Sequence, residues 1–307
     1  MQDCKLTDKR KRLYKTAFDK VYGIIPDRPK HLQLKFISED RHFAAGDATL
    51  REFRLIFDFG TKKRYIHIRA AVPNREGNHP VIVFLSDNSN IPGKYLPAED
   101  IIKRGYAIVL LDCTELTPDS ADFKKGACAG VFGSRRKKNA PGKLAIWAWG
   151  AMRVIDSLQE IKNIDSSKIT IAAHSKLGQA ALISAAADER INCVIANDCI
   201  NLGSPVGKAE ICEAMPYLFC PRYAELISTS EAPDGYRTLL ELCSDKIILI
   251  GSTDDDPCSS PDLELEAINA LVKSGIPKER IFLRIRRGSH YLSVDDWKAY
   301  LDFIRGI

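Results

Sequence analysis

The sequence offers little that would build a disulfide framework or a structural metal site. Its nine cysteines are odd in number, and no two of them stand at a CxxC or other zinc-like spacing. Disulfide-rich domains and zinc sites depend on such paired spacings. We therefore expect reduced cysteines, no metal and no other cofactor.

Long apolar runs are also lacking. No stretch of about 18 apolar residues occurs, whereas a membrane-spanning helix needs about 20. The opening segment, MQDCKLTDKRKRLYKTAF, contains no apolar stretch long enough for a secretion signal. These absences predict a cytoplasmic protein that does not enter a membrane.

The excess of positive charge is too small to define a partner. Lys and Arg number 45 against 40 Asp and Glu, which gives a net charge of +5. Much of the excess lies in two short runs, residues 5–15 and 134–138. Neither run is interleaved with aromatic residues as nucleic-acid-binding motifs are, so both are interpreted as solvated faces. The second run would matter for acidic substrates if it lay near a pocket mouth.

What the sequence does contain is a change of pattern at residue 80. Three runs before it alternate apolar and polar residues, as half-buried antiparallel strands do: 32–37, 51–59 and 64–72. Six nearly continuous apolar runs follow, as expected of buried parallel strands: 80–87, 107–112, 168–174, 191–198, 246–251 and 280–286. The helical patterns between them include 142–162 and 260–275.

This order predicts one domain of the α/β class over residues 1–307. We expect a mostly parallel central sheet with antiparallel N-terminal strands and helices on both faces, which is the layout of an α/β-hydrolase. Residues 1–30 should form a helical lead-in. Two stretches without clear periodicity, 113–141 and 200–230, follow strand ends, where ligands bind in open α/β sheets. We expect the second to be an active-site loop insertion.

The segment KITIAAHSKLGQAAL, residues 168–182, passes from a β-branched strand directly into a helix. A sharp turn of this kind, with small neighbours, holds a serine hydroxyl clear of the backbone, where a base can activate it. Ala173 and Gly178 are the small residues here. Ser175 is therefore the candidate nucleophile, and the alternative is that it only caps the helix.

Two further features favour catalysis. His290 follows the last predicted strand, and the acidic triplet 254–256 follows the strand before it. The order Ser, Asp, His along the chain is that of α/β-hydrolases. His290 is thus the predicted general base. His174, beside the serine, is expected to pack against the site or to support it.

The segment HSKLGQAALISAAADERINCVIAND resembles the carbohydrate esterase group of α/β-hydrolases that contains glucuronoyl esterases and acetylxylan-esterase-like bacterial proteins. Their elbow reads approximately G-H-S-R-L-G-K. The likeness continues in VYGIIPDRP, IWAWGAMRVIDSL, MPYLFCPRY and GSHYLSVDDWKAYLDF, and so covers nearly the whole chain. The resemblance implies that Ser175 is the nucleophile and that His290 acts as base and acid.

For the acid of the triad, two positions stay open. Glucuronoyl esterases commonly place it after the strand that follows the nucleophile, where this chain has Asp198. Other members of the wider fold place it after the next strand, at the triplet 254–256. Either carboxylate could orient the imidazole and stabilise its charged form. We narrowly favour the triplet, with Asp254 first because of its turn spacing from Gly251.

The resemblance also implies an oxyanion hole and substrate contacts. The oxyanion would be held by the backbone N–H of Lys176 and by one from the loop 87–90, which includes Asn88. Lys176 stands where the group usually has Arg, and Gln179 where it usually has Lys. The loss of a cation at residue 179 weakens the specific expectation of glucuronoyl esterase activity.

Aromatic residues give a weaker signal. The tryptophans are expected to pack in the core, two in an apolar helical pattern and one in the last helix: Trp147, Trp149 and Trp297. Sugar stacking is better sought in the long loop, at Tyr217, Phe219 and Tyr223.

Our leading hypothesis is a serine-dependent carboxylic ester hydrolase that acts on acylated or uronate-esterified carbohydrate fragments through a Ser-His-Asp triad. Its partner would be a small-molecule ester, and not nucleic acid. The alternatives are a peptidase or deacylase of the same fold, because fold does not fix substrate, and a non-catalytic protein that binds carbohydrate or a protein partner. The acyl group, the sugar and the oligomeric state stay open.

Overall fold

The computed structural model describes residues 2–306 except 133–136, 200, 201, 203, 205–208, 228, 257 and 259. Within these residues one sheet runs through the molecule in the order β1-β2-β3-β5-β4-β6-β7-β8-β9. The strands are β1 (His31–Phe43), β2 (Ala48–Asp58), β3 (Lys63–Pro73), β4 (His79–Ser86), β5 (Ala107–Asp112), β6 (Ile164–His174), β7 (Ile191–Asn197), β8 (Ile247–Thr253) and β9 (Ile281–Arg286).

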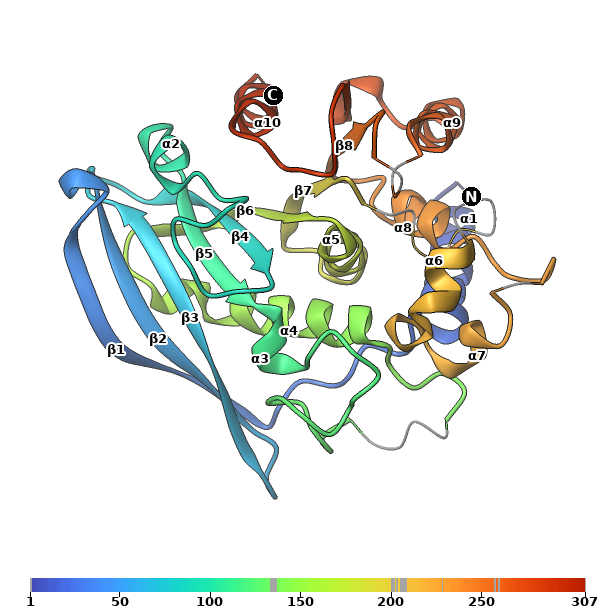
Figure 1. The fold of residues 1–307 in the computed structure, drawn as a ribbon, viewed down its shortest axis with the longest axis horizontal. Helices are drawn as coiled ribbons and strands as arrows, with labels where there is room; N and C mark the ends of the chain where they lie inside the picture. The colour runs from blue at the N-terminus through green and yellow to red at the C-terminus, as the bar shows by residue number, and fades with distance from the viewer. Residues whose placement is uncertain are drawn as a thin grey trace.

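Helices connect and cover these strands (Figure 1). They are α1 (Gln2–Lys15), α2 (Ala98–Lys103), α3 (Cys113–Leu116), α4 (Lys143–Ser157), α5 (Lys176–Ala187), α6 (Ala209–Ala214), α7 (Pro221–Ala224), α8 (Gly235–Leu242), α9 (Pro261–Lys273) and α10 (Val294–Arg305). Shorter helical turns are Thr16–Val21, Ala44–Gly46, Leu158–Glu160, Pro216–Leu218 and Lys278–Arg280.

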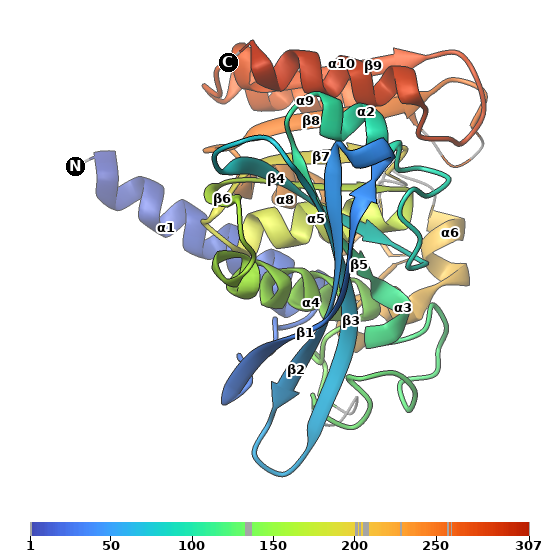
Figure 2. The ribbon, with the colours of Figure 1, turned by 90° about the vertical axis from the view of Figure 1, so that its left-hand side faces the viewer.

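The predicted mixed sheet is confirmed. β1, β2 and β3 pair antiparallel, and β3 also pairs antiparallel with β5. From β5 onward, each neighbouring pair of strands is parallel. Figure 2 shows the first three strands as a long ribbon that extends past the helices. All nine apolar or alternating runs of the sequence became strands.

The central strands are buried on both sides, which explains their continuous apolar runs. In β4, Val81 and Val83 face the core cluster that includes α4, α5 and α8. Ile82 and Phe84 face the opposite cluster, which includes α2 and α10. Helices therefore cover both faces, as predicted. The tryptophans pack in these two clusters, as expected: Trp147, Trp149 and Trp297.

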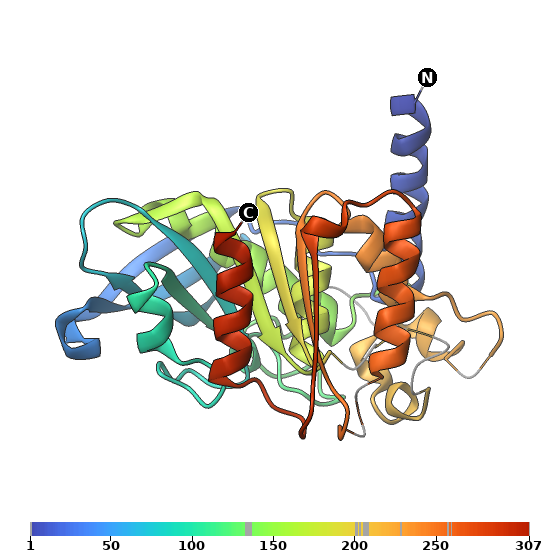
Figure 3. The ribbon, with the colours of Figure 1, turned by 90° about the horizontal axis from the view of Figure 1, so that it is seen from above.

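The N-terminal segment is helical, and α1 projects away from the body of the protein (Figure 3). Its attachment to α8 includes a hydrogen bond from the Arg10 guanidinium to the Leu242 carbonyl at 3.0 Å. Lys9 and Glu241 form an ion pair at 2.9 Å. None of the described helices is long and apolar enough to cross a membrane.

The predicted loop insertion at 200–230 is only partly described. It contains α6, the turn Pro216–Leu218 and α7, while 200, 201, 203, 205–208 and 228 lie outside the described residues. Most of the basic run 134–138 also lies outside them. The sheet brings the ends of β4, β6, β7, β8 and β9 to one edge, since these strands are parallel.

Candidate active site

Ser175 occupies the turn between β6 and α5, as the sequence predicts. Its backbone angles, φ 60° and ψ −142°, are strained for a residue with a side chain. The turn is fixed by hydrogen bonds from Ser175 N–H to the Asn197 carbonyl and from Gly178 N–H to the Ser175 carbonyl, both 2.8 Å. Its side chain makes no capping hydrogen bond to α5, so the interpretation of Ser175 as a helix cap is not supported.

His290 lies in the turn after β9 and is bound to a carboxylate of the acidic triplet. Its Nδ1 is 2.5 Å from Asp256 Oδ2, and the Asp256 side chain is only 1% exposed. Asp256 also accepts a hydrogen bond from the Cys258 N–H at 2.8 Å. A buried carboxylate on Nδ1 fixes the tautomer that leaves Nε2 free to accept a proton.

The sequence-based choice of Asp254 within the triplet is therefore not supported. Asp254 turns to the neighbouring segment, where its carboxylate accepts a hydrogen bond from the Gly288 N–H at 3.1 Å. Its own N–H donates to the Arg286 carbonyl at 3.2 Å. The first residue after β8 thus continues the pairing with the end of β9, and Asp256 is the one that reaches the imidazole.

Asp198, the second candidate for the acid, lies after β7 and is fully buried. Its carboxylate accepts hydrogen bonds from the Thr253 hydroxyl at 3.0 Å, the Tyr291 N–H at 3.1 Å and the Asn197 amide at 3.1 Å. Burial raises the pKa of Asp198 to about 6 against the opposing effect of the hydrogen bonds from Thr253 and Tyr291. Asp198 thus holds the backbone of the residue that follows His290.

His174 packs against His290, with ring centroids 4.4 Å apart. It is 7% exposed, and burial, together with the charge of His290, lowers its pKa to about 3. Its Nδ1 lies 3.2 Å from the amide nitrogen of Asn197, whose oxygen accepts a hydrogen bond from the Tyr300 hydroxyl at 2.6 Å. His174 is therefore neutral and fixed in place, as expected of a supporting residue.

A glycine makes room for this network. A Cβ at Gly251 in β8 would lie 1.9 Å from the Tyr300 hydroxyl and 2.3 Å from Asn197 Oδ1. Real Cβ atoms do not approach other atoms so closely, so any side chain here would displace the Asn197 amide and the Tyr300 hydroxyl that donates to it.

One group of ligand-type atoms near the site could be considered for a metal. His174, Asp198 and His290 each place one such atom within 4.8 Å of the others. His174 Nδ1 contacts the Asn197 amide nitrogen at 3.2 Å. Nδ1 of His290 and both Asp198 oxygens also have partners. This arrangement fits a hydrogen-bond network and not a metal site.

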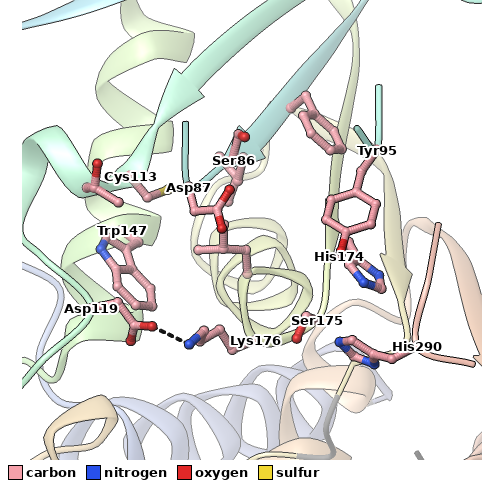
Figure 4. Close-up of a pocket in the computed structure, with 14 residues that line it drawn as sticks. Ser86, Asp87, Tyr95, Cys113, Asp119, Trp147, His174, Ser175, Lys176 and His290 are labelled. Atoms are coloured by element: carbon pink, nitrogen blue, oxygen red, sulfur yellow. Dashed lines mark hydrogen bonds and ion pairs between the residues drawn. The ribbon is translucent and has the colours of Figure 1, made fainter. Parts of the chain in front are cut away.

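Ser175 and His290 share a cavity of about 230 Å³ (Figure 4). One nitrogen of the His290 ring is turned toward Ser175 in this view. The lining residues are Phe84, Leu85, Ser86, Asp87, Tyr95, Cys113, Thr114, Asp119, Trp147, His174, Ser175, Lys176, Leu177 and His290. The pocket therefore combines the nucleophile and its base with an apolar floor and a few polar groups.

Two of the predicted substrate contacts do not reach this pocket. Gln179 is fully buried one helical turn after Ser175, where its amide donates to the Tyr22 hydroxyl at 2.7 Å and accepts from the Cys199 thiol at 2.9 Å. Asn88 lies in the turn after β4, with its side chain bonded to Asp87 and to the Asn90 N–H. Asp87, and not Asn88, lines the pocket.

The third predicted contact, Lys176, does line the pocket. Its ammonium group forms an ion pair with Asp119, from the loop after α3. Asp119 also accepts a hydrogen bond from the Tyr217 hydroxyl at 3.2 Å. The other two loop aromatics considered for sugar stacking, Phe219 and Tyr223, are buried in the core and cannot stack on a ligand.

The sequence is similar to those of known carbohydrate esterases. A model of the family described as fungal glucuronyl esterases matches residues 58–210. Carbohydrate esterase MZ0003, from an unknown prokaryotic organism, is 24% identical over 234 residues, which are 67% of this chain and 54% of that protein. The chain is similar in sequence to these carbohydrate esterases. It spans about half the length of this curated relative.

Solved structures show the same fold. The glucuronoyl esterase from Solibacter usitatus superposes with a TM-score of 0.83 at 22% identity, over 97% of this chain and 91% of that one. The CE15 glucuronoyl esterase from Teredinibacter turnerae T7901 gives 0.82 at 18% identity, over 98% and 84%. The catalytic domain of the Hypocrea jecorina enzyme gives 0.78 at 16%, over 99% and 84%. The predicted α/β-hydrolase fold and the resemblance to this esterase group are confirmed.

Proposed function

We propose that this protein is a serine-dependent carboxylic ester hydrolase acting on acylated or uronate-esterified carbohydrate fragments. The observation that carries the proposal is the placement of Ser175 on a strained strand-to-helix turn in one pocket with His290, whose Nδ1 is bound by buried Asp256. Nucleophile, base and orienting acid each come from the end of a parallel strand.

The reaction would proceed through an acyl-enzyme. The Ser175 hydroxyl oxygen attacks the ester carbonyl carbon while its proton passes to His290 Nε2. The bond to the alcohol oxygen then breaks, and His290 returns the proton to the leaving alcohol. Water, deprotonated by His290, attacks the acyl group and releases the carboxylic acid and free Ser175. Asp256 stabilises the imidazolium formed in each half.

The oxyanion of each tetrahedral intermediate needs preorganised donors. The backbone N–H of Lys176 is the first of α5, and the first N–H groups of a helix have no partner inside it. The end of β4 at Ser86 and the following residue Asp87 line the same pocket and are the source we propose for a second N–H. Both assignments place donors around the carbonyl that Ser175 attacks.

The proposed substrate class, carbohydrate esters, is inferred from the proteins that are similar to this chain. The proteins with the same fold and matching family model are described as glucuronoyl or carbohydrate esterases. The structure from Sporotrichum thermophile with a bound methyl 4-O-methyl-glucopyranuronate is among those similar to this chain, with a TM-score of 0.69 at 16% identity. A uronate ester or an acylated sugar is therefore the substrate class that we propose.

A fluorophosphonate probe tests the serine chemistry without knowledge of the substrate. We expect covalent labelling of the wild-type protein, with the label mapped to Ser175, and none of Ser175→Ala. Equal labelling of both proteins, or no labelling of the wild type, would contradict the proposal. Hydrolysis of methyl glucuronate and of an acetylated monosaccharide would then separate the two ester types.

A further inference from the structure

We infer that the Asp119–Lys176 ion pair is a subsite for two neighbouring hydroxyl groups of a neutral, sugar-like substrate. This inference rests on the proposed function and adds the part of the pocket that recognises the group attached to the ester. In Figure 4 the pair lies on the side of the pocket opposite His290, with Ser175 between them. An ester carbonyl at Ser175 would therefore direct one of its two substituents toward the pair.

The pair retains hydrogen-bonding capacity after its own contacts are made. An ammonium group has three donors, and Lys176 uses one of them on Asp119. A carboxylate has about four acceptor positions, of which Asp119 uses one for Lys176 and one for the Tyr217 hydroxyl. Both side chains are partly open to solvent, at 29% and 32% exposure. Each hydroxyl of a diol both donates and accepts, which matches this mixed set.

The charge balance favours a neutral ligand. An anionic ligand that approached Lys176 would be repelled by the carboxylate of Asp119 beside it. A cationic ligand that approached Asp119 would be repelled by the ammonium group of Lys176. Like-charge contacts of this kind cost binding energy, whereas hydroxyl groups satisfy both partners.

The position of the pair is held from beneath by α4. The Trp147 indole N–H donates to the Thr117 carbonyl at 3.1 Å, and the ammonium group of fully buried Lys143 binds the Thr117 hydroxyl. Thr117 stands two residues before Asp119, so the loop that presents the carboxylate is anchored in the core. The cavity volume of about 230 Å³ is below the range of about 300 to 1,000 Å³ that suits drug-sized ligands. It suits a single sugar ring.

The test uses two esters with the same reacting centre. Methyl glucuronate carries ring hydroxyls, whereas methyl tetrahydropyran-2-carboxylate has the same ring and ester without them. We expect wild-type protein to prefer methyl glucuronate in kcat/KM, and Asp119→Asn to lower this preference about 10- to 100-fold, because hydrogen bonds to a charged group are lost. Asp122→Asn, which removes a carboxylate from the same loop outside the pocket lining, should keep the preference.

An equal preference in wild type and Asp119→Asn, or no preference in the wild type, would overturn the subsite. Failure of the proposed function looks different, because then neither ester is hydrolysed and the fluorophosphonate probe does not label Ser175. Calorimetric binding of methyl glucuronate to Ser175→Ala keeps the subsite testable in that case. Weaker binding on adding Asp119→Asn supports it, and unchanged or absent binding overturns it.

Discussion

Glu264 is a buried carboxyl group close to the proposed triad, and its replacement by glutamine tests the electrostatics of this region. It lies in the first turn of α9 and is fully buried. Burial raises its pKa to about 8, and the negative charges of Asp198 and Asp256 add to the shift against the opposing effect of Ser252. The folded protein therefore keeps this proton at neutral pH.

The pH dependence of stability follows from this shift. The unfolded chain releases the proton near the ordinary glutamate pKa of 4.5, whereas the folded protein keeps it to about pH 8. The stabilisation is therefore complete below about pH 4.5 and is lost as the pH rises to about 8. At about 1.4 kcal/mol per pH unit, the total loss is on the order of 5 kcal/mol. Glutamine has no proton to lose at this position.

Urea unfolding at intervals between about pH 5 and 8 measures the effect. We expect the unfolding free energy of Glu264→Gln, relative to the wild type, to rise by about 1.4 kcal/mol per pH unit across this range. Glu266→Gln, exposed on the same helix, is the matched control and should show no such slope. A difference between Glu264→Gln and wild type that is independent of pH would refute the reasoning.

Two further predictions test the roles assigned to Asp256 and Gln179. Asp256→Asn should lower kcat on an activated acetyl ester by about 10⁴-fold because an amide favours the wrong tautomer of His290. The kcat of Asp254→Asn should stay close to that of the wild type. A larger loss of kcat in Asp254→Asn than in Asp256→Asn would instead assign the triad acid to Asp254. Gln179→Met should lower the unfolding free energy by about 1–3 kcal/mol, because the hydrogen bond with buried Tyr22 is lost. Its KM should not change, whereas a large rise in KM would show that Gln179 contacts substrate.

Much of the fold could be predicted because the central strands of the sheet are buried on both faces. Continuous apolar runs such as 107–112 and 191–198 have few other uses in a chain of this length, and each became a strand. The alternating runs before residue 80 likewise predicted the antiparallel strands β1, β2 and β3. The position of Ser175 followed from the same pattern, since a strand that meets a helix without a loop leaves only one residue at the turn.

The side-chain partners could not be predicted because they depend on contacts distant in sequence. Spacing places all of 254–256 after one strand, but only the pairing of Asp254 with Gly288 decides that Asp256 meets His290. Gln179 is buried by Tyr22, 157 residues earlier, which no local pattern reveals. Asp119 lies in a stretch expected to be functional, yet nothing in its neighbours marks it as the partner of Lys176.

The central claim is that Ser175 becomes acylated during ester hydrolysis. Mass spectrometry of the protein, acid-quenched during turnover of 4-nitrophenyl acetate and then digested, tests this directly. We predict an acetyl group on the peptide that contains Ser175. In His290→Ala this activated ester can still acetylate Ser175, whereas removal of the acetyl group by water is slowed more strongly. A larger fraction of the acetylated peptide should therefore be retained in this variant. Hydrolysis without acetylation at Ser175, or equal hydrolysis by Ser175→Ala, would contradict the account.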